Sequence, residues 1–220
     1  MTWHPDMPDE YKNQIVTGDA RVLAERIPDE SVDLIFTDPV YDRIDDYRWL
    51  AETAARVLKP DRACLVYCGI GYQEATQKAL RQGGRPVTWI LPTVYSAGNT
   101  PRFHRLGFAK WTMLLWAGGE PVAHFCDAQI STFEKRSNGH KWTKNTRPIS
   151  AYLKAFSRDG EAVLDLYTGG GTVPAVCKQL RRNYIAFEID PATADLARER
   201  VANTQPPLFV PEPEQLGLGL

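Results

Sequence analysis

The stretch Leu164-Asp165-Leu166-Tyr167-Thr168-Gly169-Gly170-Gly171-Thr172 decides the fold. An apolar run over 162–166 is typical of a buried strand, and a helical pattern over 173–180 follows the glycines. Glycines at such a turn let the backbone approach a ligand, and the helix N-terminus offers free N–H groups. The stretch predicts a strand–loop–helix unit that binds a nucleotide-type ligand, with a tight structural turn as the alternative.

An acidic residue supports the ligand interpretation. Glu188 ends the next predicted strand, 184–188, and follows Gly169 by 19 residues. An acid at about this distance from the first glycine typically binds ribose hydroxyls. The dinucleotide pattern G-x-G-x-x-G fails because Pro174 occupies its last position. Together with the lack of an evident hydride-transfer pair, this disfavours an NAD dehydrogenase and favours another adenosine-type ligand.

Strand-like and helix-like segments alternate along the rest of the chain. Further strands are expected at 31–37, 63–68, 87–91 and 111–116, and helices at 46–58, 71–81, 149–156 and 192–201. This alternation predicts an α/β fold with a mostly parallel sheet and helices on both faces. We expect one domain over 1–203 and a loose Pro-rich tail over 204–220.

The composition is that of an ordinary globular protein. The 220 residues are 43% hydrophobic and 24% charged, with a net charge of −1. No apolar run approaches the roughly 20 residues of a membrane span, and the N-terminus resembles no secretory signal. Cys64, Cys68, Cys126 and Cys177 lack zinc-site spacing. We expect four reduced core thiols, no metal site and a cytoplasmic location.

The charge is unevenly distributed. Residues 1–58 hold thirteen Asp and Glu against six Lys and Arg, whereas 98–147 hold eight Lys and Arg against three acids. A basic segment in a neutral protein is compatible with a polyanionic partner. The alternative is a solvated loop face.

A second motif, Thr37-Asp38-Pro39-Val40-Tyr41, ends an early strand. Ligands of doubly wound folds bind at the carboxyl ends of strands. The Asp38 carboxylate and a backbone carbonyl can accept both hydrogens of an exocyclic amino group, and Tyr41 offers a flat face for stacking. An ordinary Asp-Pro turn is the alternative for the motif in isolation.

Together these residues resemble the amino-group DNA methyltransferases, which methylate adenine N6 or cytosine N4 with S-adenosylmethionine. Residues 37–41 look like the D-P-P-Y catalytic motif, and 165–172 look like the D-P-F-x-G-S-G-T cofactor loop. Gly18-Asp19, Thr146-Arg147-Pro148 and Phe187-Glu188-Ile189-Asp190 resemble three further cofactor-site motifs. The catalytic motif precedes the cofactor loop, which is the permuted order of the beta group.

The resemblance covers residues 15–205 and implies a Rossmann-like S-adenosylmethionine-dependent methyltransferase fold. It implies a site-specific enzyme of a bacterial or phage restriction-modification system that acts on a flipped base of double-stranded DNA. The aspartate at the start of the catalytic motif favours adenine N6 over cytosine N4. The implied catalytic residues are Asp38, Pro39 and Tyr41. The implied cofactor-binding residues are Asp19, Thr146, Arg147, Pro148, Asp165, Tyr167, Gly169, Gly171, Thr172 and Glu188.

The sequence departs from the family pattern in the catalytic motif. Val40 stands where the family has a second proline, which restores a backbone N–H and frees Pro39 from the restriction that a following proline imposes. A catalytically weakened homologue that binds DNA or cofactor therefore remains an alternative. Methylation of RNA or of a small amine is another alternative within the same fold.

Two further segments are candidates for macromolecular contacts. We expect a DNA-recognition insertion at about 92–146, whose candidate contacts to phosphates or bases are Arg102, His104, Arg105, Lys141 and Lys144. Solvated cations are the alternative for any one of them. A homodimer could complete so short a reader. Gln205-Pro206-Pro207-Leu208-Phe209 resembles the Q-x-x-L-F peptides that bind bacterial sliding clamps, and the alternative is a tail that packs on its own domain.

Overall fold

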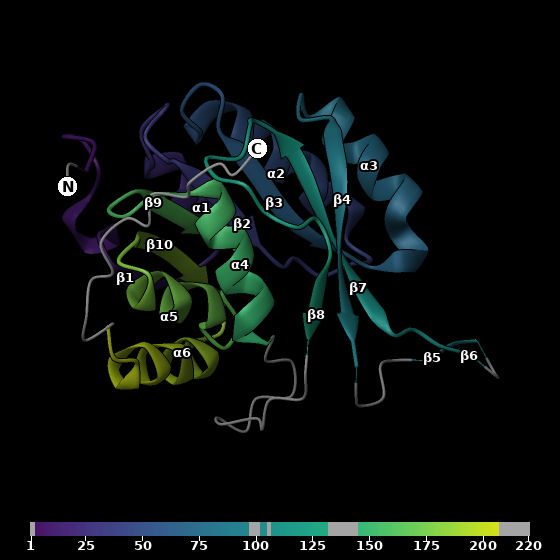
Figure 1. The fold of residues 1–220 in the computed structure, drawn as a ribbon. Helices are drawn as coiled ribbons and strands as arrows, with labels where there is room; N and C mark the ends of the chain where they lie inside the picture. The colour runs from purple at the N-terminus through teal and green to yellow at the C-terminus, as the bar shows by residue number, and fades with distance from the viewer. Residues whose placement is uncertain (1–2, 97–101, 105–106, 132–144, 207–220) are drawn as a thin grey trace, which may run out of the picture.

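The fold was obtained as a computed structural model (Figure 1). It describes residues 3–96, 102–104, 107–131 and 145–206, and it describes only the backbone of 102–104 and 107–108.

An eight-stranded sheet forms the centre of the molecule. Its strands, in spatial order, are β1 (Gln14–Thr17), β10 (Asn183–Glu188), β9 (Ala162–Asp165), β2 (Leu34–Thr37), β3 (Ala63–Cys68), β7 (Trp111–Gly118), β4 (Val87–Tyr95) and β8 (Gln129–Ser131). The first five strands are parallel, β7 is antiparallel to both its neighbours, and β8 is parallel to β4. A separate hairpin pairs β5 (Arg102–His104) with β6 (Gly107–Phe108).

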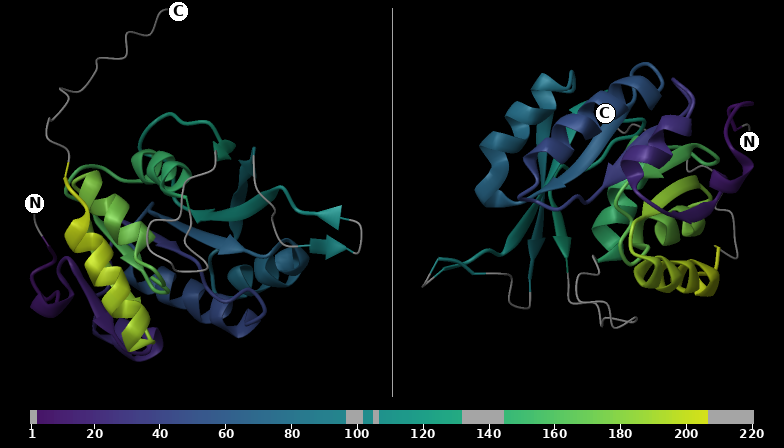
Figure 2. Two further views of the ribbon diagram at one scale, coloured as in Figure 1. Left: turned by 90° about the horizontal axis from the view of Figure 1, so that it is seen from below. Right: turned by 180° about the vertical axis from the view of Figure 1, so that it is seen from behind.

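Helices cover both faces of the sheet (Figures 1 and 2). The α-helices are α1 (Ala20–Leu23), α2 (Ile44–Val57), α3 (Gln73–Gln82), α4 (Thr146–Phe156), α5 (Thr172–Gln179) and α6 (Pro191–Asn203). The 3₁₀ turns are η1 (Asp9–Tyr11), η2 (Ala24–Arg26) and η3 (Ile70–Tyr72). One apolar cluster joins α1, α2 and α3 to the sheet, and a second joins α4, α5 and α6 to the opposite face.

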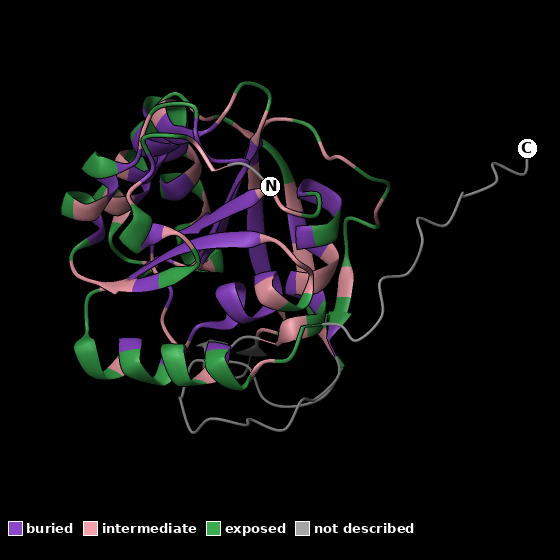
Figure 3. Ribbon diagram, turned by 90° about the vertical axis from the view of Figure 1, so that its left-hand side faces the viewer, coloured by how far each residue is buried: buried purple, intermediate pink, exposed green. Residues whose placement is uncertain are grey.

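The two clusters explain why the central strands are continuously apolar. Along β2, Ile35 belongs to the cluster under α1–α3, whereas Leu34 and Phe36 belong to the cluster under α4–α6. Because helices cover both faces, every residue of β2 and β3 is buried, while the outer faces of helices such as α6 remain exposed (Figure 3).

The strand directions gather the ends of seven strands at one edge of the sheet. β1, β10, β9, β2 and β3 are parallel, and β4 and β8 run in the same direction because β7 reverses between them and β3. The carboxyl ends of these seven strands therefore share one edge. Asp38 and the loop that starts at Leu166 lie there, and so do Ser96 and Ser131, which follow and end β4 and β8.

The last helix closes onto the first strand. Arg198 of α6 donates from Nε and Nη2 to the Ile15 carbonyl of β1, over 3.0 and 2.7 Å. Its Nη2 also donates to Thr17 Oγ1 over 2.6 Å. β1 is thereby held at the edge of the sheet beside β10.

The predicted α/β class with a mostly parallel sheet is confirmed. Two boundaries differ in an instructive way. The strand expected to end at Leu91 continues to Tyr95 through Pro92, because β8 pairs only with residues 93–95 and leaves Pro92 at an edge position, where proline is tolerated. The helix expected from Ile149 begins at Thr146, because the Asn145 side chain caps it.

Strands β1 and β8 were missed, because they are short and half-exposed and carry no clear periodicity. The expectation of four core thiols is wrong for Cys126, which is exposed, whereas Cys64, Cys68 and Cys177 are buried and unpaired with one another. In the parts of the chain that the structure describes, no helix is long and apolar enough to cross a membrane.

Candidate active site

The catalytic turn follows β2 directly. Thr37 is buried, Asp38 is half-buried, and the Val40 side chain is 51% exposed. The Tyr41 ring lies over Gly69, where a Cβ atom would come within 2.9 Å of that ring. Gly69 therefore gives the tyrosine its place beside the end of β3. Burial raises the pKa of Tyr41, and the neighbouring Asp38 raises it further, so the phenol stays neutral at physiological pH.

A buried hydroxyl joins this turn to the glycine loop, residues 165–172, which the sequence predicts to be the cofactor loop. Thr37 Oγ1 donates to Asp165 Oδ1 over 2.9 Å. The backbone N–H of Tyr167 donates to the same Thr37 oxygen over 3.1 Å and to Asp165 Oδ1 over 3.3 Å. Because β2 and β9 are neighbours in the sheet, the last residues of both strands meet here.

The Asp165 carboxyl has an unusual ionisation. Its side chain is deeply buried, and this burial raises its pKa to about 7. Hydrogen bonds from Thr37, Thr168 and the Tyr167 amide favour the carboxylate and oppose the shift, whereas the nearby Asp38 adds to it. Asp165 therefore changes its protonation state near neutral pH.

The glycines of the loop have different tasks. Gly171 has φ of +71°, and a Cβ there would lie 2.9 Å from Ala197 of α6. Gly169 has φ of +51°, but a Cβ there would meet nothing within 4 Å. Gly171 is thus required by the packing of the loop on α6, whereas Gly169 borders open space.

Glu188 fixes the loop from the neighbouring strand. Its Oε2 accepts the Gly169 N–H over 2.8 Å, and its Oε1 accepts the Asp190 N–H over 2.9 Å. The carboxylate is half-buried at the end of β10, and each of its oxygens keeps further lone pairs for other donors. An acid that is already oriented beside open space fits the ribose of an adenosine-type cofactor.

Arg200 holds the loop from the other side. Its Nη1 donates to Thr172 Oγ1 over 2.7 Å and to the Gly170 carbonyl over 3.2 Å. Sequence reasoning missed Arg200, because 28 residues separate it from Thr172 and no local pattern connects the two.

Asp19 lies where β1 and β10 end together. Thr17 pairs with Glu188, and the Gly18 N–H donates to the Glu188 carbonyl over 2.9 Å. The Asp19 side chain caps α1 by accepting the Arg21 N–H over 2.8 Å.

A polar–aromatic cluster that the sequence did not predict extends this part of the site. Arg21 donates to Asp46 of α2 over 2.6 Å, and its guanidinium lies 5.2 Å from the centre of the Trp49 ring. That ring meets the Tyr167 ring edge-on, with centroids 6.4 Å apart. The cluster connects α1 and α2 to the glycine loop.

The third predicted cofactor segment, 146–148, forms the first turn of α4. The cap residue Asn145 accepts the Arg147 N–H over 3.0 Å, and its Nδ2 donates to Ser131 Oγ over 2.6 Å. Pro148 is buried, Thr146 is half-buried and Arg147 is exposed. The segment starts at the same sheet edge as the glycine loop, and α4 shares an apolar cluster with α5.

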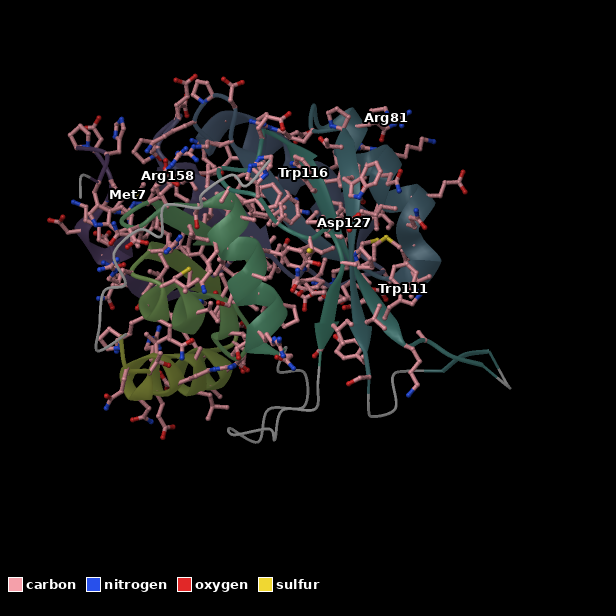
Figure 4. All side chains as sticks on the ribbon, viewed as in Figure 1. Met7, Arg81, Trp111, Trp116, Asp127 and Arg158 are labelled. Carbon is pink, nitrogen blue, oxygen red and sulfur yellow. The ribbon has the colours of Figure 1, made fainter. Side chains whose placement is uncertain are left out.

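The candidate DNA contacts are placed only in part. Arg102 and His104 belong to β5, of which the backbone alone is described, and Arg105, Lys141 and Lys144 lie outside the described residues. Trp111, at the start of β7, packs against the core under α1–α3, and Trp116 lies toward the other end of that strand (Figure 4). Within the described residues no group of three His, Cys, Asp or Glu side chains could hold a metal ion.

The site as a whole brings two predicted motifs together at one edge of the sheet. The glycine loop lies beside Glu188 and near Asp19, and the turn at Asp38 carries a carboxylate and a neutral tyrosine. Thr37 and Asp165 connect the two directly. The chain thus has a Rossmann-like α/β fold, with the two predicted motifs at one edge of its sheet.

Comparisons of the sequence find similar DNA methyltransferases. The family model described as DNA methylase, for N6 and N4 methyltransferases, matches residues 108–199. The type II methyltransferase M.HpaI of Haemophilus parainfluenzae is 25% identical, and the alignment covers 86% of this chain and 74% of that protein. M.BamHI of Bacillus amyloliquefaciens is 24% identical over 86% of this chain and 57% of its own length. The sequence therefore resembles those of the amino-group DNA methyltransferases.

Comparisons of the structure find the same fold in two DNA methyltransferases. The M1.HpyAVI–SAM complex is similar with a TM-score of 0.74 and 20% identity, over 86% of this chain and 98% of that one. The cytosine-N4-specific PvuII DNA methyltransferase is similar with a TM-score of 0.74 and 15% identity, over 84% of this chain and 85% of that one. The fold is therefore that of the DNA methyltransferases.

Proposed function

We propose that this chain transfers a methyl group from S-adenosylmethionine to the exocyclic amino group of a flipped DNA base, preferably adenine N6. The observation that supports the proposal most is the hydrogen bond between Thr37 and Asp165, which joins the turn proposed as catalytic to the loop proposed to bind the cofactor. The match to the DNA methylase family model and the SAM complex of a structurally similar protein support the cofactor.

The residues at the glycine loop fit this cofactor. Glu188 is oriented to accept hydrogen bonds from the ribose, and Gly169 borders open space. Asp19 and the first turn of α4, residues 146–148, are proposed as further walls of the same site. When bound, S-adenosylmethionine supplies an electrophilic methyl group on a sulfonium centre.

Asp38, Pro39 and Tyr41 are the proposed catalytic residues. A base inside a duplex cannot reach Asp38, so the target base must leave the stack at a cost of a few kcal/mol. The Asp38 carboxylate and the Pro39 carbonyl then accept the two amino hydrogens, which keeps electron density on the nitrogen. Tyr41, whose raised pKa keeps it neutral, stacks on the base. Catalysis by this set is mainly positioning and local electrostatics.

The DNA contacts are proposed to lie along the same edge. The basic residues between 98 and 147 join the described chain at the ends of β4 and β8, on the side of Asp38. The Ser96 N–H donates to the Ser131 carbonyl over 3.1 Å, and Ser131 also contacts Asn145. The ends of two basic segments and the start of α4 are thereby joined, which supports one recognition surface within 92–146.

A methyl-transfer assay with labelled S-adenosylmethionine tests the function. Duplex DNA, RNA and free nucleosides should be compared, with Asp38→Ala as the control variant. We expect transfer to duplex DNA by the wild type alone. Equal transfer by Asp38→Ala would refute the catalytic role and favour a binding homologue. Methylation-sensitive sequencing of DNA from cells that express the chain then distinguishes N6-methyladenine from N4-methylcytosine and reports the sequence context.

Two partner interactions are separate proposals. The segment from Gln205 to Phe209 is proposed to bind a sliding clamp, although residues 207–209 lie outside the described part of the chain. A clamp pull-down compares the wild type with the double variant Leu208→Ala and Phe209→Ala. Equal recovery of the two proteins would reject clamp binding by this segment. A homodimer is tested by the molar mass in solution with and without DNA.

A further inference from the structure

Thr37 stands immediately before the proposed catalytic aspartate, yet its side chain is directed into the protein, with 1% exposure. We infer that Thr37 is a positioning residue for methyl transfer, whose hydroxyl holds Asp38 in a fixed relation to the cofactor loop. This inference rests on the proposed function.

The Thr37 hydroxyl acts both as a donor and as an acceptor in this contact. A threonine hydroxyl has one hydrogen to donate and lone pairs to accept. The hydrogen goes to Asp165 Oδ1, and the oxygen accepts the Tyr167 N–H. Both partners belong to the segment 165–167, so a single side chain of β2 fixes the start of the cofactor loop. Valine has nearly the same shape but makes neither bond.

A second contact holds the catalytic turn from its other end. The turn leads into α2, and Trp49 of α2 packs edge-on against the Tyr167 ring. The residues from 38 to 43 thus lie between two attachments to the same three-residue segment. A shift of the cofactor loop reaches Asp38 through Thr37, which is its direct neighbour in the chain.

The position of this polar bridge argues for a role beyond folding. Where β2 and β9 pair, the side chains are apolar, as at Leu34, Ile35 and Leu164. One polar side-chain contact lies at the start of the strands, where Asp33 Oδ2 accepts the Ala162 N–H over 2.9 Å. The Thr37 contact lies at their carboxyl ends, where the proposed catalytic turn and cofactor loop begin. In some proteins buried polar groups select one particular arrangement of the fold, and we infer this role for the Thr37 contact.

Thr37→Val and Thr37→Ser test the inference by steady-state kinetics with duplex DNA. Thr53→Val is the matched control, because Thr53 is also buried but lies on α2. We expect kcat of Thr37→Val to fall about tenfold or more, since small displacements of reacting groups cost that much. The KM for S-adenosylmethionine should change less than kcat. Thr37→Ser and Thr53→Val should stay close to the wild type.

A titration provides a readout that does not depend on activity. The Asp165 carboxyl is followed by carbon-13 NMR in the cofactor-free protein. Thr37→Val should raise its pKa, because the hydrogen bond from Thr37 favours the carboxylate, whereas Thr37→Ser should leave it unchanged. The other groups that face Asp165, in both variants, are Asp38, Thr168, the Tyr167 amide and Cys177.

The outcomes separate the inference from the proposed function. An active wild type with an equally active Thr37→Val overturns the inference alone, as does a Thr37→Ser variant that is as impaired as Thr37→Val. A wild type that transfers no methyl group refutes the proposed function, and the titration then decides the bridge by itself. A pKa of Asp165 that is the same in Thr37→Val and wild type shows that the bridge is absent.

Discussion

The Gly169 N–H donates to Glu188 Oε2 over 2.8 Å, so the glycine loop is attached to the strand end that carries the proposed ribose-binding acid. The residue that we propose to bind the cofactor therefore also holds the loop beside it. Loss of the Glu188 charge should therefore lower the affinity for S-adenosylmethionine, both by removing a contact to the ribose and by loosening the loop.

We expect Glu188→Gln to weaken binding of S-adenosylmethionine about 10- to 100-fold, because hydrogen bonds to a charged group contribute roughly 1.5–3 kcal/mol. Isothermal titration calorimetry measures the change. Glu199→Gln, on the exposed side of α6, is the control and should bind like the wild type. Unaltered affinity in Glu188→Gln would remove the glutamate from the cofactor site.

Gly169 and Gly171 should respond differently to alanine. At Gly171 the new Cβ would lie 2.9 Å from Ala197 and the backbone has φ of +71°, so Gly171→Ala should lower the free energy of unfolding by about 2 kcal/mol or more. Gly169→Ala meets no neighbour, so it carries only the backbone strain and should lose mainly cofactor affinity. Urea unfolding and calorimetry on both variants check this. Equal losses of stability would contradict the division of tasks.

Val40→Pro should strengthen the enzyme rather than disturb it. The Val40 side chain is 51% exposed, and proline keeps the carbonyl that accepts the Arg43 N–H over 3.2 Å. A second proline restricts Pro39 and stiffens the turn. We expect kcat to rise severalfold, while stability changes by no more than about 1 kcal/mol. Val40→Ala controls for the loss of the valine side chain. A lower kcat in Val40→Pro than in Val40→Ala would contradict the idea that valine at this position loosens the turn.

The Asp165 carboxyl predicts a pH dependence of stability. Its pKa of about 7 in the folded state lies above that of an unfolded aspartate, so the folded state binds the proton more tightly. The stabilisation this provides is fully present below pH 4 and is lost as the pH rises toward 7. Relative to Asp165→Asn, the wild type should lose a few kcal/mol between pH 4 and pH 8. Urea unfolding of both proteins across this range measures the difference, and a wild type that gains stability with pH relative to Asp165→Asn would have the wrong sign.

The parts of the fold that sequence predicts are those with a strong local pattern. The apolar run of β9, the glycines after it and the helix that follows are local features, and β3 was predicted with its observed bounds, 63–68. β1 and β8 have only four and three residues and are half-exposed, so they become strands through their neighbours rather than through their own pattern.

The residues of the candidate site likewise fall into those that a local sequence pattern predicts and those that it does not. Asp38 and Glu188 stand at strand ends, where the sequence alone marks them. Arg200, Trp49 and Arg21 act through contacts with residues far away in the chain, and no spacing rule reveals such contacts. The separate tasks of neighbouring glycines likewise depend on which helix packs against each one.

The contact of α6 with β1 brings the last helix and the first strand of the fold together, so that the order of elements resembles a closed ring. Because Arg198 seats the last helix on the first strand, a short linker from α6 to β1 would close the chain without moving the sheet. If that ring were opened between β8 and α4, the cofactor loop would come first and the catalytic turn second, in an otherwise unchanged site. The order of the two motifs along the chain therefore depends on where the chain begins, whereas their contact in space depends on the order of the strands in the sheet.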